Sequence, residues 1–291
     1  MALKNDGTVW SWGYNTNSQL GIGSASPIPT VNPVLINTLS GISAISVGTS
    51  HSLALKSDGT VWAWGSNFAG LGNGSTQSAT PVQVTGLSGV AAIAAGGSHS
   101  LALLNTGTLV AWGSDGYGEL GIGGPSPGSP TPVPVPNLSG VIAICAGVNT
   151  SFAILSDGTL WSWGQNDSGQ LGQGGLPGGP GVPTPTLTQA PSGITAVQAG
   201  SSFAVALRND GTVWSWGSNI SSQLGLGGGG NFITTPTRIP DLAGVQSIAA
   251  RGIFCIVLMP DKTLRSWGYN DFQQLGRPFN QYIPLPVAIT Q

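Results

Sequence analysis

Histidines are the first residues in this chain whose chemistry could define a site. There are only two, His51 and His99, and they occupy equivalent places in two copies of a repeated segment. Other copies hold Thr150, Phe203 and Phe254 at that place, so it is interpreted as a packing or turn position. Zinc sites need three or four ligands at suitable spacing, and no second ligand stands near either histidine. We therefore predict no metal site.

Ten aspartates and glutamates are the candidates for acid–base chemistry. Asp115 fills a slot that is Asn in the five other copies, and both residue types suit it because their side chains bond nearby backbone. Four carboxylates, no more than one per copy, fall outside the repeat pattern: Glu119, Asp167, Asp241 and Asp271. General acid–base catalysis needs positioned groups, and the one arrangement left open is a pair of carboxylates that face each other across a central channel. The other five are assigned to hairpin turns: Asp6, Asp58, Asp157, Asp210 and Asp261.

Nucleophiles and phosphate-binding loops have no better support. Neither histidine lies near a G-x-S-x-G strand-turn. The glycine runs at 172–181 and 227–230 lack the Lys-Ser/Thr ending and the following helix of a phosphate loop. Cys145 and Cys255 lie in apolar, strand-like runs and are interpreted as inert core thiols. The sequence therefore predicts no catalytic residue, no cofactor and no enzyme activity.

The elements that position all these residues come from a repeat of about 51 residues. Each copy holds four short stretches suited to β-strands, with an Asp-Gly hairpin signal between the second and third. The fourth is a Pro-Val stretch, which suits a sheet edge because Pro cannot donate to a ladder. Thr106-Gly107 and Asp261-Lys262 replace Asp-Gly in two copies, where we expect weaker turns or another type. A Trp-Gly pair marks each third strand, at Trp12, Trp64, Trp112, Trp163, Trp216 and Trp267.

Six four-strand modules without helical periodicity predict an all-β fold, a β-propeller that spans residues 1–291 as one domain. The tryptophans of TVWSWG-type strands share one sheet face, so Trp64, Trp163 and their counterparts are predicted to form the core between blades. First strands number five and the other three types six each, which leaves one blade incomplete at the N/C-terminal seam. We expect a six-bladed ring whose last strand pairs beside the first hairpin. The alternative is a homo-oligomer through the open seam, because a free edge invites pairing.

Composition excludes several classes of protein. Only 6% of the residues are charged and the net charge is −2, whereas nucleic-acid binding needs clustered Lys and Arg. Six of the eight basic residues lie in the last third of the chain, where we expect a mildly positive sector. No apolar run approaches the ~18 residues that cross a bilayer, and the sequence shows no signal region. We therefore expect no nucleic acid and no membrane insertion, and assign no compartment.

The phrases SHSLALKSDGTVWAWGSN and WGQNDSGQLGQG closely resemble the repeat of the regulator of chromosome condensation family. The resemblance covers essentially the whole chain. It implies a β-propeller, typically of seven blades, that acts mostly as a protein-interaction ring. The founding member exchanges nucleotide on a small GTPase and contacts chromatin, and a propeller-type bacterial inhibitor of β-lactamase resembles it in fold. This chain departs from the pattern in having six modules, no basic extensions and no insertion that matches the exchange activity.

The function predicted is that of a non-enzymatic, protein-binding or scaffold propeller. Repetition is strict where it builds blades and loose in two loops, and loops on a rigid scaffold are where binding usually resides. One loop follows Trp-Gly-x-Asn, and the other is a long Gly/Pro/Ser connection before the Pro-Val strand. The alternatives are an extracellular or virion structural component and a regulator of a GTPase or other enzyme. The candidate partner-binding residues, unless each packs beneath its own loop, are Phe68, Tyr117, Ile220 and Phe272.

Overall fold

Each repeat folds into an antiparallel sheet. The computed structural model describes residues 1–291 except residues 69, 177, 180, 279–281 and 290–291. The described chain contains 23 strands and no helix, so it offers no helical segment able to cross a membrane. The first sheet has three strands, and five sheets of four strands follow it. The all-β prediction and the strand count, including the one short blade, are confirmed.

Within every sheet the strands are bonded in chain order, each to the next. The strands are β1 (Ala2–Leu3), β2 (Val9–Asn15), β3 (Ser26–Leu35), β4 (Ile42–Val47), β5 (His51–Lys56), β6 (Val61–Ser66), β7 (Gln77–Gln83), β8 (Val90–Ala95), β9 (His99–Leu104), β10 (Leu109–Asp115), β11 (Ser126–Pro134), β12 (Val141–Ala146), β13 (Thr150–Leu155), β14 (Leu160–Gly164), β15 (Val182–Leu187), β16 (Ile194–Ala199), β17 (Phe203–Arg208), β18 (Val213–Ser218), β19 (Phe232–Arg238), β20 (Ser247–Arg251), β21 (Phe254–Leu258), β22 (Leu264–Tyr269) and β23 (Tyr282–Ala288).

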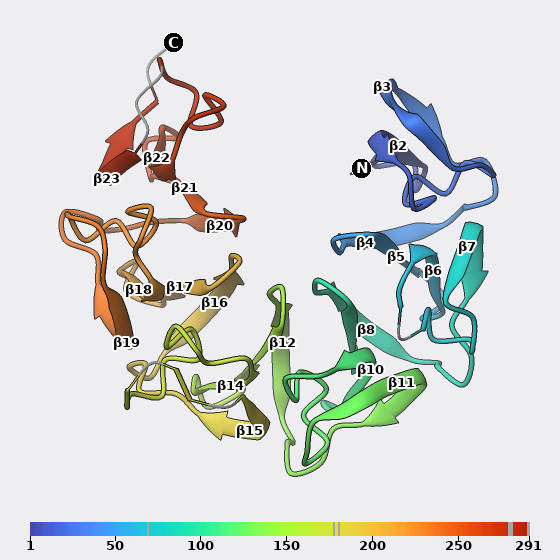
Figure 1. The fold of residues 1–291 in the computed structure, drawn as a ribbon, viewed down its shortest axis with the longest axis horizontal. Coiled ribbons are helices and arrows are strands. Elements are labelled where there is room, and N and C mark those ends of the chain that lie inside the picture. The colour runs from blue at the N-terminus through green and yellow to red at the C-terminus, as the bar shows by residue number, and fades with distance from the viewer. Residues whose placement is uncertain (69, 177, 180, 279–281, 290–291) are drawn as a thin grey trace.

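The sheets are arranged radially as the blades of a β-propeller (Figure 1). The first strands of successive blades, β4, β8, β12, β16 and β20, pack against one another around the centre. The Pro-rich strands lie at the outer edges of the sheets, where a missing N–H donor costs no ladder bond. In the third blade much of the long Gly/Pro/Ser connection belongs to the outer strand, because β11 begins at Ser126, inside the segment we expected to be a loop, whereas β15 and β19 begin after the glycine runs.

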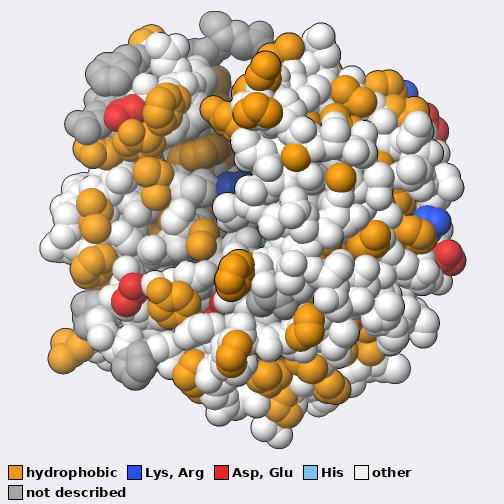
Figure 2. All heavy atoms as spheres, turned by 45° about the vertical axis from the view of Figure 1, so that its right-hand side comes forward, with side chains coloured by type: hydrophobic (Ala, Val, Ile, Leu, Met, Phe, Trp, Pro, Cys, Tyr) orange, Lys and Arg blue, Asp and Glu red, His pale blue; other side chains and the backbone are white. Residues whose placement is uncertain are grey.

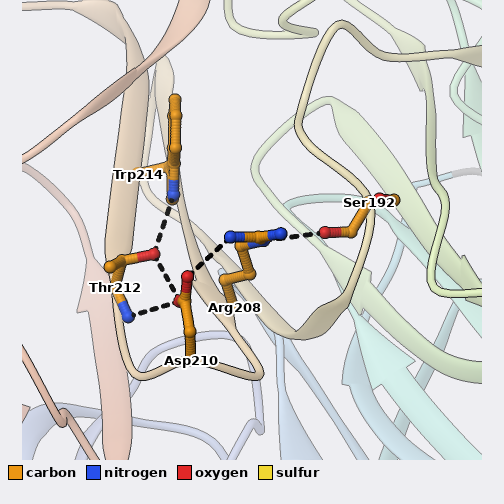
Figure 3. Close-up of polar contacts among 5 residues, drawn as sticks. All are labelled: Ser192, Arg208, Asp210, Thr212 and Trp214. Carbon is orange, nitrogen blue, oxygen red and sulfur yellow. Dashed lines mark hydrogen bonds and ion pairs between the residues drawn. The ribbon is translucent and has the colours of Figure 1, made fainter.

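Turns of the Asp-Gly-Thr type join the second and third strands of the blades. In the fifth blade, Asp210 Oδ1 accepts hydrogen bonds from the Thr212 N–H at 3.0 Å and the Thr212 hydroxyl at 2.6 Å. Arg208 donates to Asp210 and to the Ser192 carbonyl, and Trp214 Nε1 donates to Thr212 (Figure 3). The aspartates assigned to turns from the sequence therefore have a structural role.

The two turns without Asp-Gly keep the same geometry. Gly107 has φ of 78° and Lys262 has φ of 69°, and each N–H donates to the carbonyl three residues back, at 2.9 and 3.0 Å. Asp261 still accepts from the N–H and hydroxyl of Thr263. The prediction of another turn type was wrong, because the left-handed residue and the following Thr are retained, whereas the weaker stability expected of these turns stays a prediction. Lys262 adopts a conformation that is ordinarily left to glycine.

Tryptophans of the third strands fill the contacts between blades. Trp163 is fully buried, and its Nε1 donates to the Glu119 carbonyl of the preceding blade at 3.0 Å. Gly121 makes room for the ring, since a Cβ there would lie 2.8 Å from Trp163 Nε1. Each such side chain buries about 150–250 Å², which stabilises the contact by roughly 4–6 kcal/mol before entropy. The second-position tryptophans that are fully buried in this way are Trp64, Trp112, Trp163, Trp216 and Trp267.

The seam between the first and last blades departs from the expected ring. The blades containing β1 and β23 face each other across an opening (Figure 1), and β23 is bonded to β22 and not to the first hairpin. Trp12 is 41% exposed, because no described blade precedes β2 to cover it. On the other side, Leu264 is also 41% exposed, although its counterparts in the other blades are buried. Closure by strand pairing and the burial of Trp12 were therefore wrong predictions.

Candidate functional site

The histidines and cysteines belong to the packing between blades. His51 Nε2 lies 3.0 Å from Ser100 Oγ and His99 Nε2 lies 2.9 Å from Ser151 Oγ, each in the next blade. Burial lowers the pKa of His51 to about 3 and that of His99 to about 4, and it raises the pKa of the Cys145 thiol to about 12. The described residues contain no group of three or more metal-ligating side chains. These groups therefore serve as neutral parts of the core.

In the first blade and in the third to sixth blades, the loop that follows the third strand is braced from within by a repeated pair of side chains. Asp115 Oδ1 accepts the Leu120 N–H at 2.9 Å, and the Asn at this place in the other braced loops does the same. Glu119 Oε2 accepts the Tyr117 N–H at 2.8 Å, as Gln274 does for Phe272 at 3.0 Å. Glu119 thus belongs to the repeat after all, at a place that is Gln in most copies, and the sequence reading that set it apart was wrong.

Those loops lie on one face of the propeller. Each third strand ends beside the turn that joins the first two strands of its own blade: the Ser66 N–H donates to the Ser50 carbonyl, and the Ser218 N–H donates to the Ser202 carbonyl. The Asp-Gly turns lie at the opposite end of the same strands. Because all blades repeat this path, the braced loops surround the inner turns on a single face.

Four apolar side chains, which we call the rim residues, stand out from the loops that follow the third strands. The exposed fraction is 95% for Phe68, 83% for Phe272, 59% for Ile220 and 47% for Tyr117. Phe272 contacts the Tyr269 ring edge-on, with the centroids 6.2 Å apart. None of the four side chains is buried beneath its own loop, which removes the alternative interpretation of these residues. Their role in binding stays a prediction.

The molecular surface offers little charge to a partner. Figure 2 shows scattered hydrophobic and few charged side chains on one side of the molecule, with a basic side chain recessed in a hollow. The ion pairs among the described residues are Lys4–Asp6 and Arg208–Asp210, both within turns. The described surface therefore offers mainly apolar and uncharged polar groups.

Arg251 is a central residue that the sequence reading placed only in a positive sector. It ends β20 at the place where the other innermost strands are followed by Gly48, Gly96, Gly147 and Gly200. A Cβ at Gly96 would lie 2.7 Å from the Gly147 carbonyl of the next blade, and the other three glycines are similarly confined. No innermost strand follows β20, so a long side chain fits there. The signal was present in the sequence, where VQSIAAR ends in Arg and ITAVQAG in Gly.

Comparison with known proteins assigns this loop-bearing propeller to a family. The profile of the RCC1-like domain matches residues 1–290, and the chain belongs to that family. It is 34% identical over 301 residues to the human E3 ubiquitin-protein ligase HERC2, covering 99% of this chain and 6% of HERC2. It is also 34% identical to the mitochondrial RCC1 domain-containing protein RUG3 of Arabidopsis thaliana, covering 95% of this chain and 64% of RUG3. The chain thus spans less than two thirds of these relatives.

Solved structures agree on the fold. Yeast RCC1 (Prp20), in its complex with Kap60, superimposes with a TM-score of 0.91 at 24% identity, covering 100% of this chain and 72% of that one. Human WBSCR16 gives a TM-score of 0.85 at 21% identity, covering 97% of this chain and 78% of that one. A second structure of Prp20p, from Saccharomyces cerevisiae, was described together with the binding of that protein to Gsp1p and histones. At these identities the likeness shows the fold alone.

Proposed function

We propose that residues 1–291 act as one non-enzymatic propeller that binds a protein partner through the face bearing the braced loops. The observation that carries the proposal is the exposure of Tyr117, Ile220 and Phe272 on loops whose backbone is held in place, together with that of Phe68 on the corresponding loop of the second blade. Large apolar side chains on a rigid support lose little entropy on binding, and aromatic residues are common among binding hot spots. Complexes of related propellers with other proteins support the proposal.

Regulation of a GTPase or other enzyme is the second candidate function, and membership of the RCC1-like family favours it. A nucleotide-exchange assay on small GTPases of the native host tests it: exchange accelerated by the protein would establish this role. An extracellular or virion structural role is supported only by the low charge.

A matched pair of substitutions tests the proposed face. Ile220 and Ile142 have the same exposed fraction, 59%, but Ile142 is the second residue of β12, at the opposite end of the blades, next to Val141, whose N–H donates to the Gly107 carbonyl. Once a partner has been isolated from the native host, Ile220→Ala should weaken binding by about 1–2 kcal/mol, while Ile142→Ala leaves it unchanged.

The double variant Tyr117→Ala with Phe272→Ala extends the same test across the face. It should weaken binding by about 2 kcal/mol or more, the scale of a hot spot, with the folded state checked by circular dichroism. Calorimetry measures the affinities at two salt concentrations, and little salt dependence is expected because few charges are present. Unchanged affinity in both rim variants would place the site elsewhere on the protein.

We propose in addition that the exposed seam supports weak self-association. Trp12 on one side and Leu264 on the other leave apolar surface uncovered on both terminal blades, and β1 is a free strand edge of the kind that recruits another chain.

A further inference from the structure

The centre of the loop-bearing face holds a cavity of about 220 Å³. Its wall is made by the inner turns of the second to sixth blades, including Thr49, Gly97, Val148, Ser201 and Gly252. These turns adjoin the braced loops through the backbone bonds described above. The cavity, which we call the central socket, therefore opens at the middle of the proposed binding face.

Arg251 is the one charged side chain among the residues that line the central socket. Its Nη1 donates to the Val47 carbonyl at 2.7 Å and its Nη2 to the Gly48 carbonyl at 2.9 Å. The side chain thereby crosses the place where the first blade lacks an innermost strand, and it joins the sixth blade to the second. Both acceptors are neutral, so they orient the guanidinium without compensating its charge.

No carboxylate in the described part of the chain forms an ion pair with Arg251. The ion pairs found there involve Lys4 and Arg208, not Arg251. His51 is close enough to be affected by Arg251: its pKa is lowered to about 3, first by burial, then by His99 and by this arginine, so its imidazole is neutral. The guanidinium keeps its Nε–H and one N–H on each terminal nitrogen, because an arginine carries five donors.

Two hydroxyl groups add further donors at the wall. Thr49 and Ser201 line the socket, and neither side chain has a hydrogen-bond partner among the described residues. The rest of the wall is alanine, glycine and valine. The site thus combines one fixed positive charge, two free hydroxyls and small apolar walls. A phosphate dianion would leave one charge unmatched there, whereas a single carboxylate matches the one guanidinium.

We propose that the central socket binds a carboxylate, namely an Asp or Glu side chain that a protein partner inserts while the rim residues contact its surface. This rests on the proposed function for the location of the partner. Charge-assisted hydrogen bonds from guanidinium to carboxylate are the strong and directional kind. A guanidinium already held by two carbonyls needs little reorganisation to accept one.

Small probes test the socket without any partner. In the full chain labelled with ¹⁵N-arginine, the Nε–Hε signal of Arg251 is followed by NMR at constant ionic strength. The probes are N-acetyl-glutamate α-methylamide, its glutamine isostere, N-acetylglycine and inorganic phosphate. We expect a saturable shift with the glutamate probe, at least tenfold weaker binding of the neutral isostere, and weaker binding of the other two anions. Tighter binding of N-acetylglycine would reassign the socket to a chain terminus and tighter binding of phosphate to a free anion, and either result overturns the proposal.

Variants separate binding from folding. In uniformly ¹⁵N-labelled protein, where the neighbouring turn amides are observed directly, Arg251→Gln should abolish their shift response to the glutamate probe, but it also removes the link to the second blade. The double variant Thr49→Val with Ser201→Ala leaves that link intact and should weaken binding of the glutamate probe about threefold to tenfold. Arg265→Gln, which removes a guanidinium bonded to the Asp241 carbonyl, is the control and should bind normally. No saturable response in the unaltered protein, or the same affinity in the double variant, overturns the proposal. Failure of the rim variants would leave these results untouched.

Discussion

Replacing a blade-contact tryptophan by alanine should destabilise the protein far more than replacing its exposed counterpart. Trp163 is fully buried and donates to the Glu119 carbonyl, and it lies against Gly121. Trp163→Ala removes the ring from a site that cannot fill with other side chains, and the expected loss is about 3–5 kcal/mol. Trp12→Ala removes a ring that is 41% exposed. It opens no closed cavity, so the expected loss is only about 1–2 kcal/mol.

Urea unfolding followed by far-ultraviolet circular dichroism measures this difference. The slope with denaturant must be the same in the variants and the parent protein, since a changed slope indicates loss of two-state behaviour. Trp163→Phe is the intermediate case: it keeps most of the apolar area but removes the indole N–H bond to the Glu119 carbonyl, which keeps its bond from the Ser151 hydroxyl, for an expected loss of about 1–3 kcal/mol. A loss below ~1 kcal/mol for Trp163→Ala, or equal losses for Trp163→Ala and Trp12→Ala, would refute the assignment of this stripe to the core between blades.

Three further predictions concern pH and association. The pKa of His99 falls from 6.5 to about 4 on folding, so the unfolded chain binds the proton more readily and stability falls as the pH drops from 6.5 towards 4. His99→Phe, the residue type found at Phe203, should reduce this slope in urea titrations, and an unchanged slope would argue against burial of a neutral imidazole. Hydrogen bonds from Thr159 lower the pKa of Asp157. The contribution of Asp157 to the free energy of unfolding is therefore present above the pKa of the unfolded chain, and it is lost as the pH falls through the lowered pKa of the folded protein. Asp157→Asn should therefore reduce the acid sensitivity of the unfolding midpoint below about pH 4, and identical acid sensitivity in parent and variant would contradict this. Self-association at the seam should appear in sedimentation as a concentration-dependent rise in mass that Trp12→Ser lowers and Ile142→Ser does not, and a strictly monomeric parent protein would exclude it.

Much of the fold was predictable because the same local sequence signals for strands and turns occur in six copies. The Asp-Gly turn, the Trp-Gly strand and the Pro-rich edge each follow from backbone chemistry, and they gave the correct number and order of strands. The braced loops were located as well, from their position after Trp-Gly-x-Asn. Glu119 was misinterpreted because a charged residue at a Gln position looked like an exception. Its carboxylate accepts the same backbone N–H bond as the amide oxygen of Gln does in other blades.

The seam was harder to predict because ring closure depends on the rigid geometry between blades and not on local sequence. Each blade fixes its angle to the next through a buried tryptophan and a confined glycine, and small angles add up around the ring. Trp12 stays exposed because the last described blade does not reach it. Burial of the four rim residues was also undetermined by pattern, since a Phe in a loop can turn inward or outward at similar local cost.

The exceptions at the centre and the seam share one physical origin. Glycine follows the other innermost strands because a Cβ there would meet a side chain of its own blade, such as His99 at Gly96, and also the backbone or side chain of the next blade. At β20 that constraint is lifted, since the neighbouring blade has no innermost strand. The same missing strand leaves the Val47 and Gly48 carbonyls available to the Arg251 guanidinium. A break in the repeat thus converts a structural position into a charged one. That charge lies at the centre of the face where the apolar loops gather, which puts the central socket in the middle of the proposed binding face.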